Sequence, residues 1–153
     1  MTKIAFIGLG QIGAPIARNI AAAPGVQIHG FDAAPVPDIV AECEAAGIVM
    51  ADSAASAAAD ADIVITVLPT SAIVESVIMT DEFLAAPAPG ALFIDMTSSY
   101  PPQMRRVGAA LAARGFRLVD APICNGGVPG AAAGTLTLVI GGDSDDKDRA
   151  RTV

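Results

Sequence analysis

A glycine-rich run near the amino terminus constrains the fold more strongly than any other feature of this sequence. The run Gly8–Gly13, GLGQIG, follows the apolar segment Ile4–Ile7 and leads into the Ala- and Ile-rich stretch Ile12–Ala23. Between a strand and a helix, glycines at this spacing permit a tight turn, let backbone N–H groups approach a pyrophosphate, and allow close helix packing. The pattern predicts a dinucleotide-binding βα unit. The alternative is a turn in which the glycines serve only the backbone.

An acidic residue stands where a carboxylate could reach the ribose of such a ligand. Asp32 follows the expected strand Val26–Phe31 and lies 19 positions after Gly13, close to the spacing of about 20 residues typical of ribose-binding acids. Residues 30–40 contain no Lys or Arg that could neutralise a 2′-phosphate. The sequence therefore favours NAD over NADP as the cofactor. The alternative is that Asp32 only stabilises the turn before Pro35.

Short apolar runs alternate with Ala-rich stretches along the chain. The expected strands are Ile4–Ile7, Val26–Phe31, Ile48–Met50, Ile63–Leu68, Ala91–Ile94, Phe116–Val119 and Leu136–Ile140. The expected helices are Ile12–Ala23, Ile39–Ala46, Ser53–Ala59, Ile73–Ile78 and Gln103–Arg114. This alternation predicts an α/β fold, a doubly wound, Rossmann-type, mostly parallel sheet with helices on both faces. Ligands are then expected at the carboxyl ends of the strands.

Length and charge restrict the class of protein. A chain of 153 residues has the length of one domain, and its formal charge of −7 argues against nucleic acid as a partner. Cys43 and Cys124 have no second Cys or His at ligand spacing, so we expect no metal site and reduced thiols in a cytoplasmic protein. No apolar run approaches the roughly 20 residues of a membrane-spanning helix, so no membrane association is expected.

The loops that follow the fourth and fifth expected strands contain residues that could contact a ligand. Pro69 comes after the fourth strand, and Thr97 and Ser98 come after the fifth. Both loops would lie at the carboxyl edge of the sheet, where these hydroxyls could bind a nicotinamide carboxamide or a substrate carboxylate. The alternative is that Thr97 and Ser99 cap the helix that Pro101 opens.

The last third of the chain is harder to interpret from the residues alone. Consecutive glycines in the segment Gly126–Gly134 could form an anion-binding nest, but a flexible loop is the simpler expectation. The acidic segment Gly141–Asp148 is expected to be a solvated exit from the domain. His29, inside a strand, and Cys124 are expected to be structural rather than catalytic.

Four motifs in order cover nearly the whole chain. They are IAFIGLGQIGAPIARNI from Ile4, DIVITVLP from Asp62, DMTSSYPP from Asp95, and DAPICNGGVPGAAAGTLTLVIGG from Asp120. Together they resemble the β-hydroxyacid dehydrogenase family, which includes 3-hydroxyisobutyrate dehydrogenase and tartronate semialdehyde reductase, with 6-phosphogluconate dehydrogenase and imine reductases as relatives. The resemblance implies an oxidoreductase, an NAD-dependent dehydrogenase that transfers hydride between NAD and a small 3-hydroxy acid.

The resemblance also implies specific contacts. The residues expected to contact NAD are Gly8, Leu9, Gly10, Gln11, Ile12, Gly13, Asp32, Leu68, Pro69 and Thr97. The residues expected to bind the substrate are Thr97, Ser98, Asn125, Gly126 and Gly127. The sequence departs from the family pattern at Cys124-Asn125, which stands in place of a single Ser and adds one residue. This departure puts the substrate loop, but not the cofactor site, in doubt.

A second departure concerns catalysis. Enzymes of this family continue into a helical domain that builds the dimer and supplies a catalytic Lys, whereas residues 1–153 correspond to the dinucleotide-binding domain alone. The two lysines, Lys3 and Lys147, lie in the first strand and in the acidic segment. We therefore expect no catalytic residue in this chain and, without the Lys, a loss of about 10²–10⁴-fold in rate. The alternatives are a non-catalytic dinucleotide-binding module with a separate helical partner or self-association, and an imine reductase-like relative.

Overall fold

Six strands form one parallel sheet in the computed structural model, which describes residues 1–153. They are β1 (Thr2–Ile7), β2 (Val26–Phe31), β3 (Val49–Met50), β4 (Ile63–Thr66), β5 (Leu92–Asp95) and β6 (Arg117–Asp120). Their order in the sheet is β3-β2-β1-β4-β5-β6, and every neighbouring pair is parallel. The chain runs outward in both directions from β1 and β4, so the crevice beyond their carboxyl ends is where such folds bind ligands.

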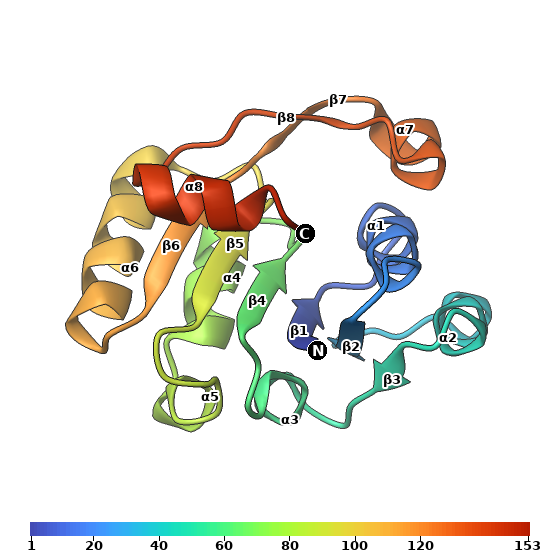
Figure 1. Cartoon of the computed structure of the whole chain (residues 1–153), viewed down its shortest axis with the longest axis horizontal. Helices are drawn as coiled ribbons and strands as arrows, with labels where there is room; N and C mark the ends of the chain where they lie inside the picture. The colour runs from blue at the N-terminus through green and yellow to red at the C-terminus, as the bar shows by residue number, and fades with distance from the viewer.

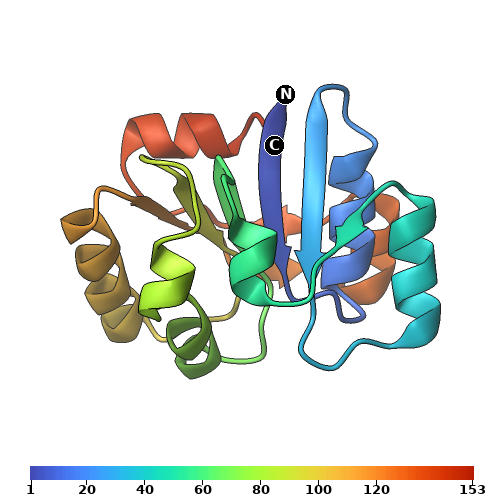
Figure 2. The ribbon, with the colours of Figure 1, turned by 90° about the horizontal axis from the view of Figure 1, so that it is seen from below.

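Helices cover both faces of this sheet (Figures 1 and 2). They are α1 (Gly13–Ala21), α2 (Pro37–Ala45), α3 (Ala54–Ala58), α4 (Ser71–Ile78), α5 (Asp81–Leu84) and α6 (Pro101–Ala113). Side chains of each strand alternate between the two faces. Ile4 and Phe6 of β1 therefore pack with α1 on one face, whereas Ala5 and Ile7 pack with α3 to α6 on the other. The predicted doubly wound α/β fold is confirmed.

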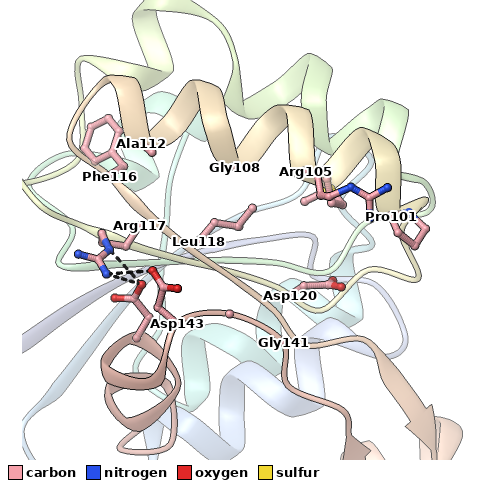
Figure 3. A pocket seen from close by; sticks show the side chains of 13 residues that line it. Pro101, Arg105, Gly108, Ala112, Phe116, Arg117, Leu118, Asp120, Gly141 and Asp143 are labelled. Atoms are coloured by element: carbon pink, nitrogen blue, oxygen red, sulfur yellow. Dashed lines mark hydrogen bonds and ion pairs between the residues drawn. The ribbon is translucent and has the colours of Figure 1, made fainter.

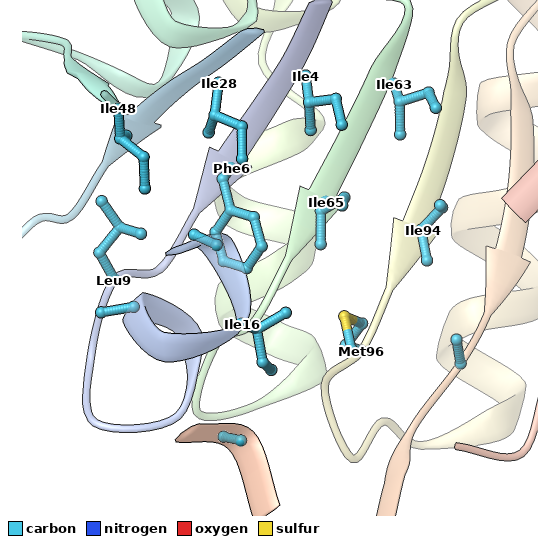
Figure 4. Packing of buried hydrophobic residues seen from close by; sticks show 14 of the residues in the cluster. Ile4, Phe6, Leu9, Ile16, Ile28, Ile48, Ile63, Ile65, Ile94 and Met96 are labelled. Atoms are coloured by element: carbon cyan, nitrogen blue, oxygen red, sulfur yellow. The ribbon is translucent and has the colours of Figure 1, made fainter. Parts of the chain in front are cut away.

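Isoleucine is the commonest residue in the apolar cluster on the α1 side of the sheet (Figure 4). One isoleucine from each of three neighbouring strands, Ile4 of β1, Ile63 of β4 and Ile94 of β5, is buried in this layer. Because such residues fit a pleated surface closely, the strands are held together by side-chain packing as well as by backbone hydrogen bonds. This packing fixes the carboxyl ends of the strands as a rigid edge.

The carboxyl-terminal third differs from the sequence-based expectation. The expected strand Leu136–Ile140 is reduced to β8 (Thr137–Leu138), which pairs antiparallel with β7 (Ile123–Asn125) outside the main sheet. The expected loop Gly126–Gly134 contains helix α7 (Gly127–Ala133). Figure 1 shows that the chain after β6 crosses through β7 to α7, which lies beside α1.

The expected solvated exit Gly141–Asp148 is exposed over most of its length, but it contains most of helix α8 (Ser144–Ala150), and Asp146 within it is buried. Acidic residues in its first turn and basic residues in its last turn suit the helix dipole. Asp146 is only 7% exposed, and Arg117 of β6 donates a hydrogen bond to it at 3.0 Å. None of the helices is both long enough and apolar enough to traverse a lipid bilayer.

Candidate dinucleotide-binding site

The three glycines of the loop between β1 and α1 have different surroundings. A Cβ on Gly8, whose φ is +101°, would lie 2.1 Å from the Val67 carbonyl oxygen, and a Cβ on Gly13 would lie 1.9 Å from the Gly8 carbonyl oxygen. A Cβ on Gly10 would meet nothing within 4 Å. Gly8 and Gly13 are therefore required by the close approach of the protein's own backbone. Gly10 instead keeps an open space clear, which is what a pyrophosphate lying on this loop requires.

Helix α1 points its amino end at the same space. Its N-cap residue, Ile12, makes no side-chain hydrogen bond, and the first turn contains no acidic residue. The positive end of the helix dipole is thus left without an internal anion. A phosphate group fits this environment.

Asp32 lies directly after β2 and is bonded to the glycine loop. Its Oδ2 accepts a hydrogen bond from the Leu9 N–H at 2.7 Å, and its Oδ1 accepts one from the Ala34 N–H at 2.8 Å. The turn-stabilising role considered above is therefore present in the structure. Each carboxylate oxygen retains a further lone pair, so the same side chain can still accept hydrogen bonds from ribose hydroxyls.

One cavity of about 600 Å³ gathers most of the expected cofactor residues. Its lining includes Gly8, Gly10, Gln11, Ile12, Gly13, Asp32, Leu68 and Pro69. Apolar side chains, including Ile73 and Val77 of α4, form the far wall and could contact the flat face of an adenine ring. Leu9 and Thr97 do not line the cavity, because both residues are buried, with exposed fractions of 4% and 2%.

The hydroxyl residues after β5 form an internal network. The Thr97 hydroxyl oxygen accepts a hydrogen bond from the Leu68 N–H at 3.0 Å, and Ser99 donates to the Asp95 carboxylate at 2.7 Å. Helix α6 has Tyr100 at its N-cap, without a side-chain cap. The alternative that Thr97 and Ser99 cap this helix is therefore wrong. Ser98 is exposed at the same edge.

The expected substrate residues lie in the β7–α7 connection. Asn125 Oδ1 accepts a hydrogen bond from the Gly126 N–H at 2.8 Å. Gly126 and Gly127 have φ values of +110° and +51°, which favour glycine at both positions. None of the three lines the cavity of the glycine loop. The pairing of β7 with β8 shifts register between Ile123 and Asn125, around the Cys124-Asn125 departure from the family pattern.

Two acids that sequence analysis did not single out, the buried Asp95 and the half-buried Asp120, lie side by side at this edge. Asp95 of β5 is opposite Asp120 of β6 in the sheet register. Burial, and then the Asp95 charge, raise the pKa of Asp120, whose Oδ1 is buried without a hydrogen-bond partner. Asp120 also lines a separate cavity of about 380 Å³ between α6, β6 and residues 141–146 (Figure 3). Both acids belong to the motifs quoted above, but their burial is visible only in three dimensions.

Neither lysine lies near the glycine-loop cavity. Lys3 is in β1 near its amino end, on the edge of the sheet opposite to the cavity. Lys147 belongs to α8. The residues around the cavity can bind and orient a ligand, but they offer no Lys that could act as an acid or base.

A parallel sheet that turns outward from β1 and β4, a glycine loop entering α1 and an acid after β2 define a Rossmann-type dinucleotide-binding domain. The family model for the NAD binding domain of 6-phosphogluconate dehydrogenase matches residues 3–153. The chain belongs to this family.

Individual relatives agree with this assignment. The chain is 43% identical to the NAD-dependent L-serine dehydrogenase of Pseudomonas aeruginosa over 99% of its own length and 50% of that protein. It is 41% identical to a solved structure of Mycobacterium tuberculosis 3-hydroxyisobutyrate dehydrogenase with L-serine, with a TM-score of 0.88 over 99% of this chain and 50% of that one. An imine reductase from Myxococcus stipitatus in complex with NAD+ has a TM-score of 0.86 at 16% identity over 99% and 50% of the two chains, a likeness of fold alone. The chain thus spans about half the length of the relatives it matches.

Proposed function

We propose that this chain is the NAD(H)-binding half of an oxidoreductase that acts on a small 3-hydroxy acid. The observation that carries the proposal is the 600 Å³ cavity at the carboxyl ends of β1, β2 and β4, which combines an open glycine loop, an uncapped helix end and a carboxylate. Bound NAD would accept or return a hydride. Every other step proposed for these residues is binding or orientation.

The proposed contacts follow the geometry of the cavity. The N–H groups around Gly10 and the start of α1 bind the pyrophosphate, and Asp32 accepts from the adenosine ribose. Leu68 and Pro69 border the nicotinamide side, and the Thr97 hydroxyl holds Leu68 in place by accepting a hydrogen bond from its N–H. Ser98, Asn125, Gly126 and Gly127 bind the substrate carboxylate.

Asp32 is proposed to select NAD over NADP. A 2′-phosphate on the ribose would face this carboxylate, and the neighbouring lining residues Ala33 and Ala34 offer no cation. Like charges in contact disfavour the complex, although less at this half-buried carboxylate than in a fully buried site. NADPH is therefore expected to bind more weakly than NADH.

A parallel titration with NADH and NADPH, followed by nicotinamide fluorescence, tests the function and the selectivity together. We expect tighter binding of NADH, and a narrowing of the preference by about tenfold in Asp32→Asn, which removes the charge but retains an acceptor. Alanine is less informative because it also removes the acceptor of the Leu9 N–H. Asp145→Asn, the same charge change on exposed α8, is the matched control. If neither nucleotide binds, the proposed function is wrong.

The activity of the whole protein is a further proposal, supported by the activities for which the relatives are named and by their length, about twice that of this chain. In a protein of that length, the catalytic Lys and the rest of the substrate pocket would come from the other half. This chain alone is expected to bind the dinucleotide without turnover. Its two cysteines are free thiols, in keeping with a cytoplasmic location.

A second candidate is a non-catalytic NAD-binding module that works with a separate partner chain or with a second copy. The observation that favours it is an apolar cavity of about 230 Å³ between the sheet and the carboxyl-terminal segment, lined by Ile16, Ile65, Ile94 and Met96 together with residues of α7, β8 and α8. Sedimentation of the isolated chain tests the form of this candidate that works with a second copy, because self-association would support that form and a stable monomer would contradict it.

A further inference from the structure

Asp95 is an unusual residue to bury. It is 1% exposed, no Lys, Arg or His forms an ion pair with it, and its titratable neighbour Asp120 has the same charge. A buried carboxylate without a cation is costly unless hydrogen bonds satisfy it. Three hydrogen bonds do so: the Thr66 hydroxyl at 2.7 Å and the Thr97 N–H at 3.1 Å donate to Oδ1, and the Ser99 hydroxyl at 2.7 Å donates to Oδ2.

These bonds connect two strands that end beside the cofactor cavity. Thr66 is the last residue of β4, whereas Thr97 lies two residues beyond Asp95 in the loop after β5. Thr97 in turn restrains Leu68, because the Thr97 hydroxyl oxygen accepts a hydrogen bond from the Leu68 N–H. The Leu68 side chain in turn lies against Gly8, with its Cδ2 at 3.1 Å from the position of a Cβ on that glycine.

From this chain of contacts we infer that Asp95 is a positioning residue for the dinucleotide site. It fixes Leu68 and the glycine loop through Thr66 and Thr97 without lining the cavity itself. The inference rests on the proposed NAD(H) binding. It assigns the effect to hydrogen-bond geometry rather than to the negative charge, since the two bonds that reach β4 and Thr97 both end on Oδ1.

Asparagine and alanine at this position separate geometry from charge. Asp95→Asn retains an oxygen that can accept from Thr66 and Thr97, and its NH₂ group can donate to the Ser99 hydroxyl. Asp95→Ala removes all three bonds. We expect Asp95→Asn to bind NADH within about twofold of the wild-type affinity, and Asp95→Ala to bind about tenfold more weakly.

The experiment measures NADH and NAD+ affinity together with hydrogen exchange of the Leu68 amide. Exchange at Leu68 is expected to accelerate in Asp95→Ala but not in Asp95→Asn, with or without nucleotide. Thr80→Val is the matched control, since it removes the hydroxyl oxygen that accepts a hydrogen bond from the Phe83 N–H at the start of α5, away from the cavity. It should lower the melting temperature and leave both readouts unchanged. If Asp95→Ala does not fold, Thr66→Val, which removes one bond, should weaken NADH binding several-fold.

Each outcome has a distinct meaning. If the wild-type protein binds neither nucleotide, the dinucleotide function itself is overturned. If it binds NADH and a folded Asp95→Ala binds equally well with a protected Leu68 amide, the positioning role is overturned and the function stands. If Asp95→Asn loses as much affinity as Asp95→Ala, or changes the ratio of NAD+ to NADH affinity, Asp95 acts through its charge and the inference is wrong.

Discussion

Gly10 and Gly13 belong to the same loop but should respond to the same substitution in opposite ways. Gly13→Ala forces a Cβ against the Gly8 carbonyl oxygen, so we expect a loss of about 3 kcal/mol or more in unfolding free energy. Gly10→Ala places its Cβ in open space, and should leave stability within about 1 kcal/mol while weakening NADH binding. Urea denaturation and fluorescence titration of both variants test this. If Gly10→Ala binds NADH with unchanged affinity, the proposal that the pyrophosphate lies against Gly10 is wrong.

His29, the single histidine of the chain, should make stability depend on pH. Burial, and then the charge of Lys3, lower the pKa of His29 below its ordinary 6.5, and its Nε2 has no hydrogen-bond partner. The unfolded chain therefore takes up this proton first. Stability is retained above pH 6.5 and is lost as the pH falls through the lower pKa of the folded state.

Comparison with His29→Leu isolates this effect. Urea denaturation at pH 7.5 and pH 5.5 should show a larger drop in unfolding free energy for the wild type than for the variant. Equal drops in the two proteins would mean that other groups control the acid sensitivity.

At the level of elements, the parallel sheet and its first helices could be predicted because their signals are local. Val26–Phe31 contains Val, Ile and Phe between flanking turn residues, and the expected strand agrees with β2 in both bounds. Helix α7 could not be predicted, because Gly127 and Gly130 disfavour a helix locally. It is instead held by packing beside α1, where Asn19 donates to the Ala131 carbonyl oxygen at 2.8 Å. Such a contact over 112 residues leaves no periodic signal.

Some residues of the candidate site could likewise be predicted from the sequence, and others could not. Gly8–Gly13 and Asp32 carry a spacing that sequence can reveal, and eight of the residues expected to contact NAD line one cavity. The burial of Leu9 and Thr97 was not predictable, since a residue's place in a motif does not say which way its side chain points. Asp95 was overlooked for a related reason: its three hydrogen-bond donors, on two strand ends, converge only in the folded chain.

Helix α8 is attached to the sheet by Arg149, and this attachment should be separable from cofactor binding. Arg149 donates to the Gly90 carbonyl oxygen at 3.1 Å and to the Asp62 carbonyl oxygen at 2.9 Å, both at the amino ends of strands. Arg149→Leu should lower the unfolding free energy by about 1 kcal/mol and accelerate amide exchange in α8. NADH affinity should not change, because the cavity lies at the opposite edge.

Arg105→Leu is the control for the α8 variant, since Arg105 is exposed and makes no ion pair. A weaker NADH complex in Arg149→Leu would mean that α8 supports the cofactor site from a distance.

At the scale of the whole molecule, the cavity and the core share the same strands. Residues at the ends of β1, β2 and β4 line the cavity, and the bodies of these strands supply Ile4, Phe6, Ile28 and Ile65 to the buried layer in Figure 4. Ligand binding should therefore oppose global unfolding rather than only order a loop. At 100 times its Kd, NADH is expected to add about 2.7 kcal/mol to the unfolding free energy, and to raise the melting temperature by several degrees in a domain of this size. Hydrogen exchange should then slow throughout the six-stranded sheet, and Gly10→Ala should show little of either effect. Protection confined to the glycine loop would mean that the sheet opens independently of the site, and would contradict this coupling.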